Sequence, residues 1–239
     1  MSDRSLNHPV SVTPHQPEVP IDTIVNILSD RYGNPRHGNK HNPLDELLYI
    51  ILSNRTQPAA HQAAYRMLKR TYPSWNSLRP AELDRVQAIL RPTGFSRLRS
   101  AQIVHILERL RMRFGRATLS PLYRMSDREA EEFLVSLPGV SKKVAKCVLM
   151  YSLQKDVLPV DVHVHRLATR LGIPTKKRPD TSQDLVEAAI PPKLRYSFHV
   201  NAIAHGRKIC TPRHAKCYLC PIELYCRKIG VPEVGERRA

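Results

Sequence analysis

The sequence lacks any apolar run long enough to cross a membrane, and its first residues contain no apolar segment of the kind that directs secretion. It is also poor in acidic residues, with 21 Asp and Glu against 38 Lys and Arg, which gives a formal net charge of +17. The missing segments argue against a membrane-spanning or exported protein, so we expect a cytoplasmic one. The basic residues are spread along the chain and predict a polyanionic partner, with nucleic acid favoured over an anionic membrane surface.

No stretch alternates apolar and polar residues as a half-buried strand would, and almost every segment after residue 20 has helical spacing. The sequence therefore predicts an all-α fold. We expect helices at 21–32, from 42 or 43, and at 58–70, 81–90, 98–114, 126–136, 141–153, 161–172, 182 or 183–190 and 194–208. Start signals include Asn42 before Pro43, a capping box of Ser126 and Glu129, and Asp161. The polar, Pro-rich residues 1–20 are predicted to form a disordered arm.

Cysteine is scarce, yet four of the five cysteines lie close together near the C-terminus: Cys210, Cys217, Cys220 and Cys226. Four such thiols in an intracellular chain favour a shared metal centre. Their C-x6-C-x2-C-x5-C spacing has one CxxC pair, whereas a zinc ribbon usually has two, and the wider loops favour an iron–sulfur cube over zinc. Two disulfides are a third alternative, disfavoured without a secretory signal. The fifth, Cys147, is predicted to be a small core residue.

The segment Leu137–Ser141 joins two predicted helices. Gly139 permits a positive φ and the close approach of another backbone. The N–H groups that open the next helix, together with the helix dipole, form an anion site where a DNA phosphate could bind, and Lys142 would add charge. The structural alternative is an ordinary turn between two helices that binds no anion.

Four stretches resemble motifs of the endonuclease III superfamily of DNA glycosylases. The helix–hairpin–helix motif is matched by LPGVSKKVAKCVL, the Gly/Pro–Asp segment by LPVDVHVHRLATRLG, and the iron–sulfur loop by HGRKICTPRHAKCYLCPIELYC; ELLYIILSNRTQ resembles the first barrel helix and its loop. The resemblance runs from about residue 21 to 228. It implies a six-helix barrel at 41–155, a second lobe made of 21–40 and 156–239, double-stranded DNA in the cleft between them, and a [4Fe-4S] cluster on the four cysteines.

By the same resemblance the catalytic residues are Lys143 and Asp161. A lysine amine can attack C1′, expel the base and leave a Schiff base that permits strand cleavage by β-elimination. The lysine favours a glycosylase with AP-lyase activity, with oxidised pyrimidines as the default substrate. Its position in the first helical turn beside Lys142 predicts a lowered pKa for Lys143. The structural alternatives are a solvated surface lysine and an aspartate that only caps a helix.

The resemblance also implies two wedges that fill the gap left by an extruded base. The first falls on Arg55, where the family commonly has glutamine, and Gln57 nearby could share its task. The second falls on Phe95, where leucine is frequent; an aromatic wedge can stack between bases. A buried turn anchor is the alternative for Phe95.

Three further residues are candidates for DNA contact. Ser141 stands where the family usually has glycine and could cap the helix or bind the phosphate. Arg213 and Lys216 lie in the cysteine loop and could contact phosphates, with a solvated loop as the alternative. We expect a monomer. Two other functions stay open: a glycosylase without lyase activity for a mismatched or modified base, and a non-catalytic protein that binds damaged DNA.

Overall fold

The computed structural model describes residues 19–36 and 38–232, so most of the predicted N-terminal arm, residues 1–20, lies outside the described part. Within it the chain is all-helical, with ten α-helices, six short 3-10 turns and no strand. The predicted all-α class is therefore confirmed. The described residues also contain no helix that is long and apolar enough to span a membrane.

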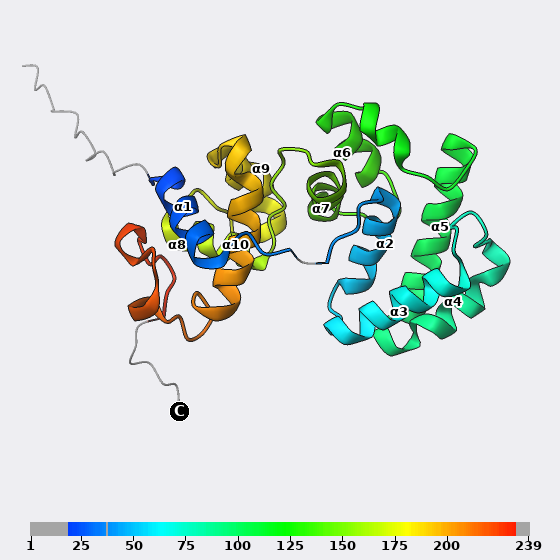
Figure 1. Cartoon of the computed structure of the whole chain (residues 1–239), viewed down its shortest axis with the longest axis horizontal. Helices are drawn as coiled ribbons and strands as arrows, with labels where there is room; N and C mark the ends of the chain where they lie inside the picture. Colours follow the sequence, from blue (N-terminus) through cyan, green and yellow to red (C-terminus); the bar gives the residue numbers. More distant parts are fainter. Residues whose placement is uncertain (1–18, 37, 233–239) are drawn as a thin grey trace, which may run out of the picture.

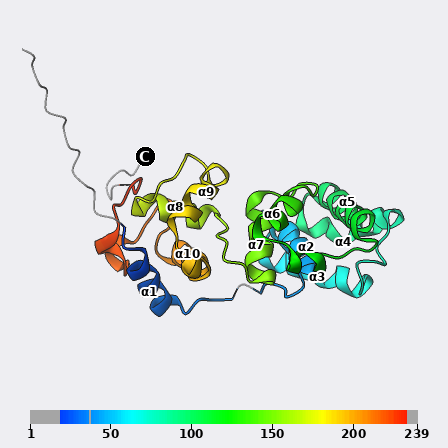
Figure 2. The same cartoon turned by 90° about the horizontal axis from the view of Figure 1, so that it is seen from above.

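The helices form two lobes that lie side by side (Figures 1 and 2). The barrel lobe is one continuous run of helices: α2 Pro43–Ser53, α3 Pro58–Thr71, α4 Leu83–Leu90, α5 Ser96–Phe114, α6 Asp127–Val135 and α7 Lys142–Leu153. The second lobe consists of α1 Ile21–Tyr32, α8 Val162–Leu171, α9 Pro179–Ala189 and α10 Arg195–Lys208. Each lobe has its own cluster of buried apolar side chains, and α1 packs against α10 although the whole barrel separates them in sequence.

The helix starts follow their local signals. Asn42 Oδ1 accepts from the N–H groups of Leu44 (2.9 Å) and Asp45 (3.1 Å) at the start of α2. Ser126 and Glu129 form the predicted capping box at α6. These bonds satisfy first-turn N–H groups that have no partner inside the helix, which is why the sequence locates these starts.

Three predicted starts are wrong. The helix expected from residue 98 begins at Ser96. Residues 80–82 form a 3-10 turn, and the α-helix predicted from residue 81 begins at Leu83. The helix expected from residue 182 or 183 begins at Pro179, because proline occupies the first helical position, where its missing N–H costs nothing.

Buried polar contacts join the lobes. The Lys146 amine on α7 lies 2.7 Å from a Glu131 carboxylate oxygen on α6 and 2.6 Å from one of Glu187 on α9. On the barrel side, fully buried Glu46 accepts from the Asn39 amide (2.5 Å) and the Lys40 N–H (2.6 Å) in the strap that follows α1. Polar contacts therefore join the lobes at both places where the chain passes from one lobe to the other.

Candidate active site

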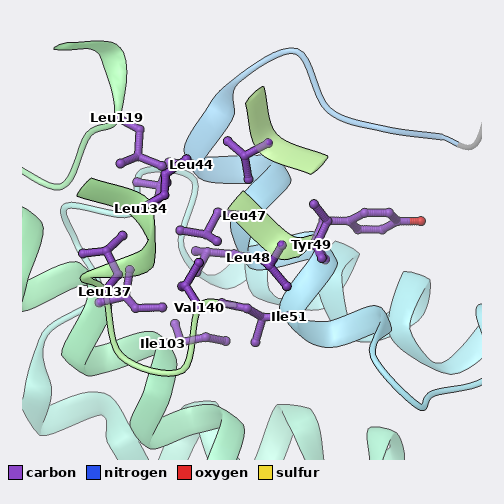
Figure 3. Packing of buried hydrophobic residues seen from close by; sticks show 14 of the residues in the cluster. Leu44, Leu47, Leu48, Tyr49, Ile51, Ile103, Leu119, Leu134, Leu137 and Val140 are labelled. Atoms are coloured by element: carbon purple, nitrogen blue, oxygen red, sulfur yellow. The ribbon is translucent and has the colours of Figure 1, made fainter. Parts of the chain in front are cut away.

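The hairpin between α6 and α7 is pinned into the barrel core. Leu137 and Val140 are buried, and Figure 3 shows them among the core side chains near Ile103. Gly139 has a φ of 66°, and an added Cβ there would come within 2.7 Å of Gln102 Nε2. Gln102 itself donates to the Pro138 carbonyl at 3.0 Å. The exposed turn at Gly139 therefore needs glycine both for its backbone angle and for space.

The start of α7 has a defined cap and one engaged charge. Ser141 Oγ accepts from the Val144 N–H at 3.4 Å, so of its two predicted roles the capping role is seen. Exposed Lys142 is paired with Asp184 on α9 at 2.9 Å. The N–H groups of Lys142 and Lys143, in the first turn, have no carbonyl four residues back to bind, which leaves them available to an anion.

The side chain of Lys143 lies against Cys147, one turn further along α7, and near Asp161. The Cys147 sulfur, then the carboxylates of Asp161 and Glu46, hold the pKa of Lys143 above its ordinary value, although burial works in the opposite direction. The predicted lowering of the pKa of Lys143 is therefore wrong in the DNA-free protein. The reason is that Cys147, Asp161 and Glu46 around the amine together outweigh the lowering effect of burial.

Asp161 caps α8 and stays ionised. Its Oδ1 accepts from the N–H groups of His163 and Val164, both at 2.9 Å, so the other carboxylate oxygen makes neither cap bond. Burial opposes ionisation, but His199, the Val164 N–H, His163 and Lys143 together keep the pKa of Asp161 below its ordinary value. The cap thus fixes the carboxylate in place while leaving one oxygen for chemistry.

Lys143 and Asp161 open into one hollow between the lobes. This cleft cavity, about 850 Å³, is lined from the barrel by Arg55, Ser141 and Lys142 and from the second lobe by His163 and Arg207. Behind it lies an inner pocket of about 310 Å³, which Lys143 and Asp161 also line; its other walls include Tyr49, His61, Gln62, Cys147, Tyr151 and His199. The two candidate catalytic groups thus line both a basic cleft and the smaller inner pocket beside it.

Sequence reasoning missed three residues of this site. Cys147 is buried as predicted, but it lies beside the Lys143 amine; its place four residues after Lys143, on the same helix face, was an available signal. His199 Nδ1 donates to the Pro159 carbonyl (2.8 Å), two residues before Asp161. Nothing in the local sequence around His199 or Arg207 indicates their approach from α10.

The two predicted wedges lie on neighbouring turns. Arg55, exposed after α2, has a φ of 53°, and Phe95, at the start of α5, has a φ of 50°. Phe95 is 61% exposed, so the interpretation as a buried turn anchor is wrong. Gln57 is exposed at the N-cap of α3.

The four clustered cysteines surround a small cavity in the second lobe. None of the five cysteines is disulfide-bonded, which contradicts the disulfide alternative. Two side-chain nitrogens face the sulfurs: Arg170 Nη1 donates to Cys210 Sγ at 3.0 Å, and His205 Nε2 lies 3.6 Å from Cys220 Sγ. Arg213 and Lys216 are exposed on the loop between the first two cysteines.

His205 is buried between Tyr32 and Cys220. Burial, then Arg166 and Arg170, lowers the pKa of His205 to about 4, so the ring is neutral. Its Nδ1 lies 2.9 Å from the Tyr32 hydroxyl. If that hydroxyl donates to Nδ1, the ring proton is on Nε2 and points at Cys220 Sγ.

Comparison with known proteins agrees with this geometry. Residues 48–192 match the family described as HhH-GPD superfamily base excision DNA repair protein. The chain is 28% identical over 206 residues to an endonuclease III of Thermotoga maritima, covering 85% of this chain and 92% of that protein. It is 31% identical over 187 residues to a thymine/uracil-DNA glycosylase of Pyrobaculum aerophilum, covering 75% and 77%.

Solved structures share the fold. A non-covalent endonuclease III–DNA complex aligns with a TM-score of 0.71 at 21% identity, over 87% of this chain and 94% of that one. A thermostable thymine-DNA glycosylase aligns with a TM-score of 0.70 at 17% identity, over 87% and 95%. With the family match spanning most of the barrel and the second lobe's α8 and α9, this chain belongs to the endonuclease III family of HhH-GPD base-excision DNA glycosylases.

Proposed function

We propose that this glycosylase removes a damaged base through a Schiff base on Lys143 and then cuts the strand on the 3′ side by β-elimination. The observation that supports this most directly is that the Lys143 amine and the Asp161 carboxylate line the same cavity between the lobes. Oxidised pyrimidine is the default substrate, since a lysine at this place is suited to covalent chemistry. DNA would lie in the basic cleft, with the lesion turned into the inner pocket.

The proton balance follows from the surroundings of Lys143. Because its pKa is raised, the resting side chain is an ammonium, which must lose a proton before it can attack. We propose the other oxygen of Asp161 as the acceptor of that proton, a transfer that is uphill in the DNA-free protein because the pKa of Lys143 is raised and that of Asp161 is lowered. The neutral amine then forms a bond to C1′ as the C1′–N bond breaks, and the departing base takes up a proton. The sugar ring then opens as the C1′–O4′ bond breaks: O4′ takes up a proton, and the attached nitrogen loses one of its protons and forms the C1′=N bond of the imine. Loss of a C2′ proton from this imine breaks the bond from C3′ to its phosphate oxygen and expels the 3′ phosphate.

DNA contacts are proposed at residues on both faces of the cleft. The first-turn N–H groups of α7 and the exposed turn at Gly139 suit one phosphate without sequence preference. To bind a phosphate, Lys142 would have to give up its ion pair with Asp184. A steep fall of DNA affinity with rising salt concentration is the expected sign of such phosphate contacts. Arg55, with Gln57 beside it, and Phe95 would enter the duplex, and Arg213 and Lys216 would bind phosphates further along the strand.

The first test is borohydride trapping on duplex DNA containing either thymine glycol or an abasic site. Adducts on both substrates are expected. Trapping on the abasic site alone would keep the lyase and reject the oxidised pyrimidine. A glycosylase activity without any adduct would favour the second candidate, a monofunctional enzyme; the similarity to a thymine/uracil-DNA glycosylase motivates a parallel assay on thymine and uracil mismatches. Binding without turnover of any substrate would leave only a damage-binding role.

Asp161→Asn separates catalysis from capping. Asparagine caps a helix about as well as aspartate, so the unfolding temperature should change little, while base removal should slow about 10²- to 10⁴-fold because the proton acceptor is lost. Single-turnover glycosylase assays and thermal unfolding measure the two effects. Asp161→Ala is the matched variant, which should lose about 1 kcal/mol more in stability. Equal activity of Asp161→Asn and wild type would show that the residue is only a cap.

We also propose that the four cysteines hold a [4Fe-4S] cluster. Within residues 19–36 and 38–232, no group of three or more His, Cys, Asp or Glu side chains converges closely enough for a single metal ion. The sulfurs instead line a cavity, which fits a group with several attachment points better than one zinc ion. Donors from Arg170 and His205 would stabilise thiolate charge. The residues therefore fit such a cluster, which would brace the loop carrying Arg213 and Lys216.

Removing one ligand tests the cluster. The purified wild type should contain about four irons per chain, and Cys220→Ala should lose most of that iron and its visible absorption. Burial raises the pKa of the Cys220 thiol to about 11, so metal binding must displace its proton and should release protons on reconstitution. Cys147→Ala is the matched control and should keep its iron. Stoichiometric zinc in place of iron would contradict the proposal.

A further inference from the structure

A buried arginine connects the two turns that hold the predicted wedges. Arg99, in the first turn of α5, is only 5% exposed. Its Nη1 donates to the Thr56 hydroxyl (2.7 Å), the Thr93 carbonyl (2.9 Å) and the Gly94 carbonyl (3.3 Å), and its Nη2 donates to the Asn54 carbonyl. One guanidinium therefore binds the turn after α2 and the turn before α5 at the same time.

These bonds surround the tips of both turns. Arg55 lies between Asn54 and Thr56, and Phe95 directly follows Gly94. A direct bond from the Thr56 hydroxyl to the Thr93 carbonyl (3.2 Å) runs parallel to the arginine's bonds. The Arg99 guanidinium also lies 5.7 Å from the centre of the Phe95 ring, within cation–π range. The backbone on either side of each tip is thus fixed to the same side chain.

The guanidinium of Arg99 is buried without a carboxylate partner. No acidic side chain of the described residues forms an ion pair with Arg99, so carbonyl and hydroxyl oxygens alone compensate its charge. Burying an unpaired charge is expensive unless its donors are satisfied. A planar fork with five donors can satisfy several oxygens at fixed angles, which a lysine cannot do. The residue is therefore suited to setting the distance and orientation between two turns.

We propose that Arg99 is a positioning residue that holds Arg55 and Phe95 as one two-part wedge, spaced to enter the duplex at the extruded nucleotide. This inference rests on the proposed function. Arg55 and Phe95 both have positive φ and are exposed, so their backbones gain little from the core, and Arg99 supplies the missing restraint. Without Arg99, Arg55 and Phe95 could each still reach DNA, but their relative position would no longer suit insertion into the duplex.

The test uses a duplex with an uncleavable tetrahydrofuran abasic site and the fluorescent base 2-aminopurine opposite it. Wild-type protein should increase the fluorescence by unstacking that base, and Arg99→Met should remove most of the increase and lower the single-turnover rate on a lesion duplex about 10²-fold. Arg109→Met, an exposed arginine on the same helix, is the matched control for loss of charge and should keep the fluorescence change.

A double-mutant cycle separates positioning from a general structural role. In a background of Arg55→Ala with Phe95→Ala, Arg99→Met should cause no further loss, because it acts through those tips. An equal loss in both backgrounds would overturn the proposal, as would a normal fluorescence change in Arg99→Met. If Arg99→Met fails to fold, Arg99→Lys serves instead, since it keeps the charge but not the fork; it should fold and still lose most of the signal.

The same duplex distinguishes this inference from the proposed function. Tetrahydrofuran cannot form a Schiff base, so the fluorescence assay reads wedge insertion even if no lesion is ever cleaved. A wild type that binds the duplex without any fluorescence change would overturn the two-part wedge, whether or not trapping on a true abasic site succeeds.

Discussion

Lys143→Gln is expected to form no borohydride-stable adduct with abasic duplex DNA and to cut it at least about 10⁴-fold more slowly than the wild type. Glutamine has a similar length but no nucleophilic amine, so neither the bond to C1′ nor the imine can form. Affinity for the tetrahydrofuran duplex should change little, because the hairpin and the basic cleft remain. Trapping gels and single-turnover cleavage assays measure the first effects, and equilibrium binding measures the last.

The matched control is Lys193→Gln, since Lys193 is an exposed lysine of the second lobe outside the cleft. It should trap and cleave like the wild type, which excludes loss of charge as the cause. An adduct of undiminished yield in Lys143→Gln would move the nucleophile to another amine. Loss of the lyase with full retention of base removal would favour the monofunctional candidate.

Lys146→Met is expected to lower the free energy of unfolding by about 3–5 kcal/mol, because two partly buried carboxylates lose the buried cation they share. Lys146 is 5% exposed, and its amine lies 2.7 Å from Glu131 and 2.6 Å from Glu187. Glu187 also accepts from the Leu158 N–H at 2.9 Å, in the segment that leads to Asp161. The melting temperature should fall by about 10 °C in a calorimetric scan of a chain this size.

Two variants make this stability prediction specific. Arg128→Met removes an exposed i,i+4 pair with Glu132 and should cost less than about 0.5 kcal/mol. Combining Lys146→Met with Glu131→Gln and Glu187→Gln should recover much of the loss, because both carboxylates that lost the Lys146 cation are then neutral; Arg195 gives up its 3.8 Å pair with Glu187 but keeps its bonds to backbone carbonyls. A triple variant no more stable than Lys146→Met alone would show that packing around the lysine stem, and not charge, holds the lobes together.

Much of the fold could be predicted because its signals are short-range. Asn42, Ser126 and Asp161 cap helices at the expected places, since a cap depends only on N–H groups two or three residues away. The start of α9 at Pro179 lies ahead of the predicted one, because proline at the first helical position needs no side-chain cap to begin the helix. The motif spacings indicated the family, because each motif is a contiguous segment whose chemistry its own residues determine.

The candidate site was only partly predictable, since its electrostatics depend on residues far apart in sequence. The exposure of Phe95 reflects how the turn before α5 meets the barrel, which no local pattern encodes. The clamp by Arg99 reaches a turn more than forty residues earlier, so neither segment alone indicates it.

The sequence by itself determined the helices, their caps, the hairpin glycine and the order of the motifs, because these follow from the periodicity and hydrogen bonding of neighbouring residues. Tertiary structure alone decided which carboxylates surround Lys143. Asp161 and Glu46 come from the start of α8 and from α2, and together with Cys147, one turn along the same helix, they raise the pKa of Lys143 where the sequence predicts a decrease. The physical reason is that Coulombic interactions act through space, and only the packing of the two lobes sets those distances.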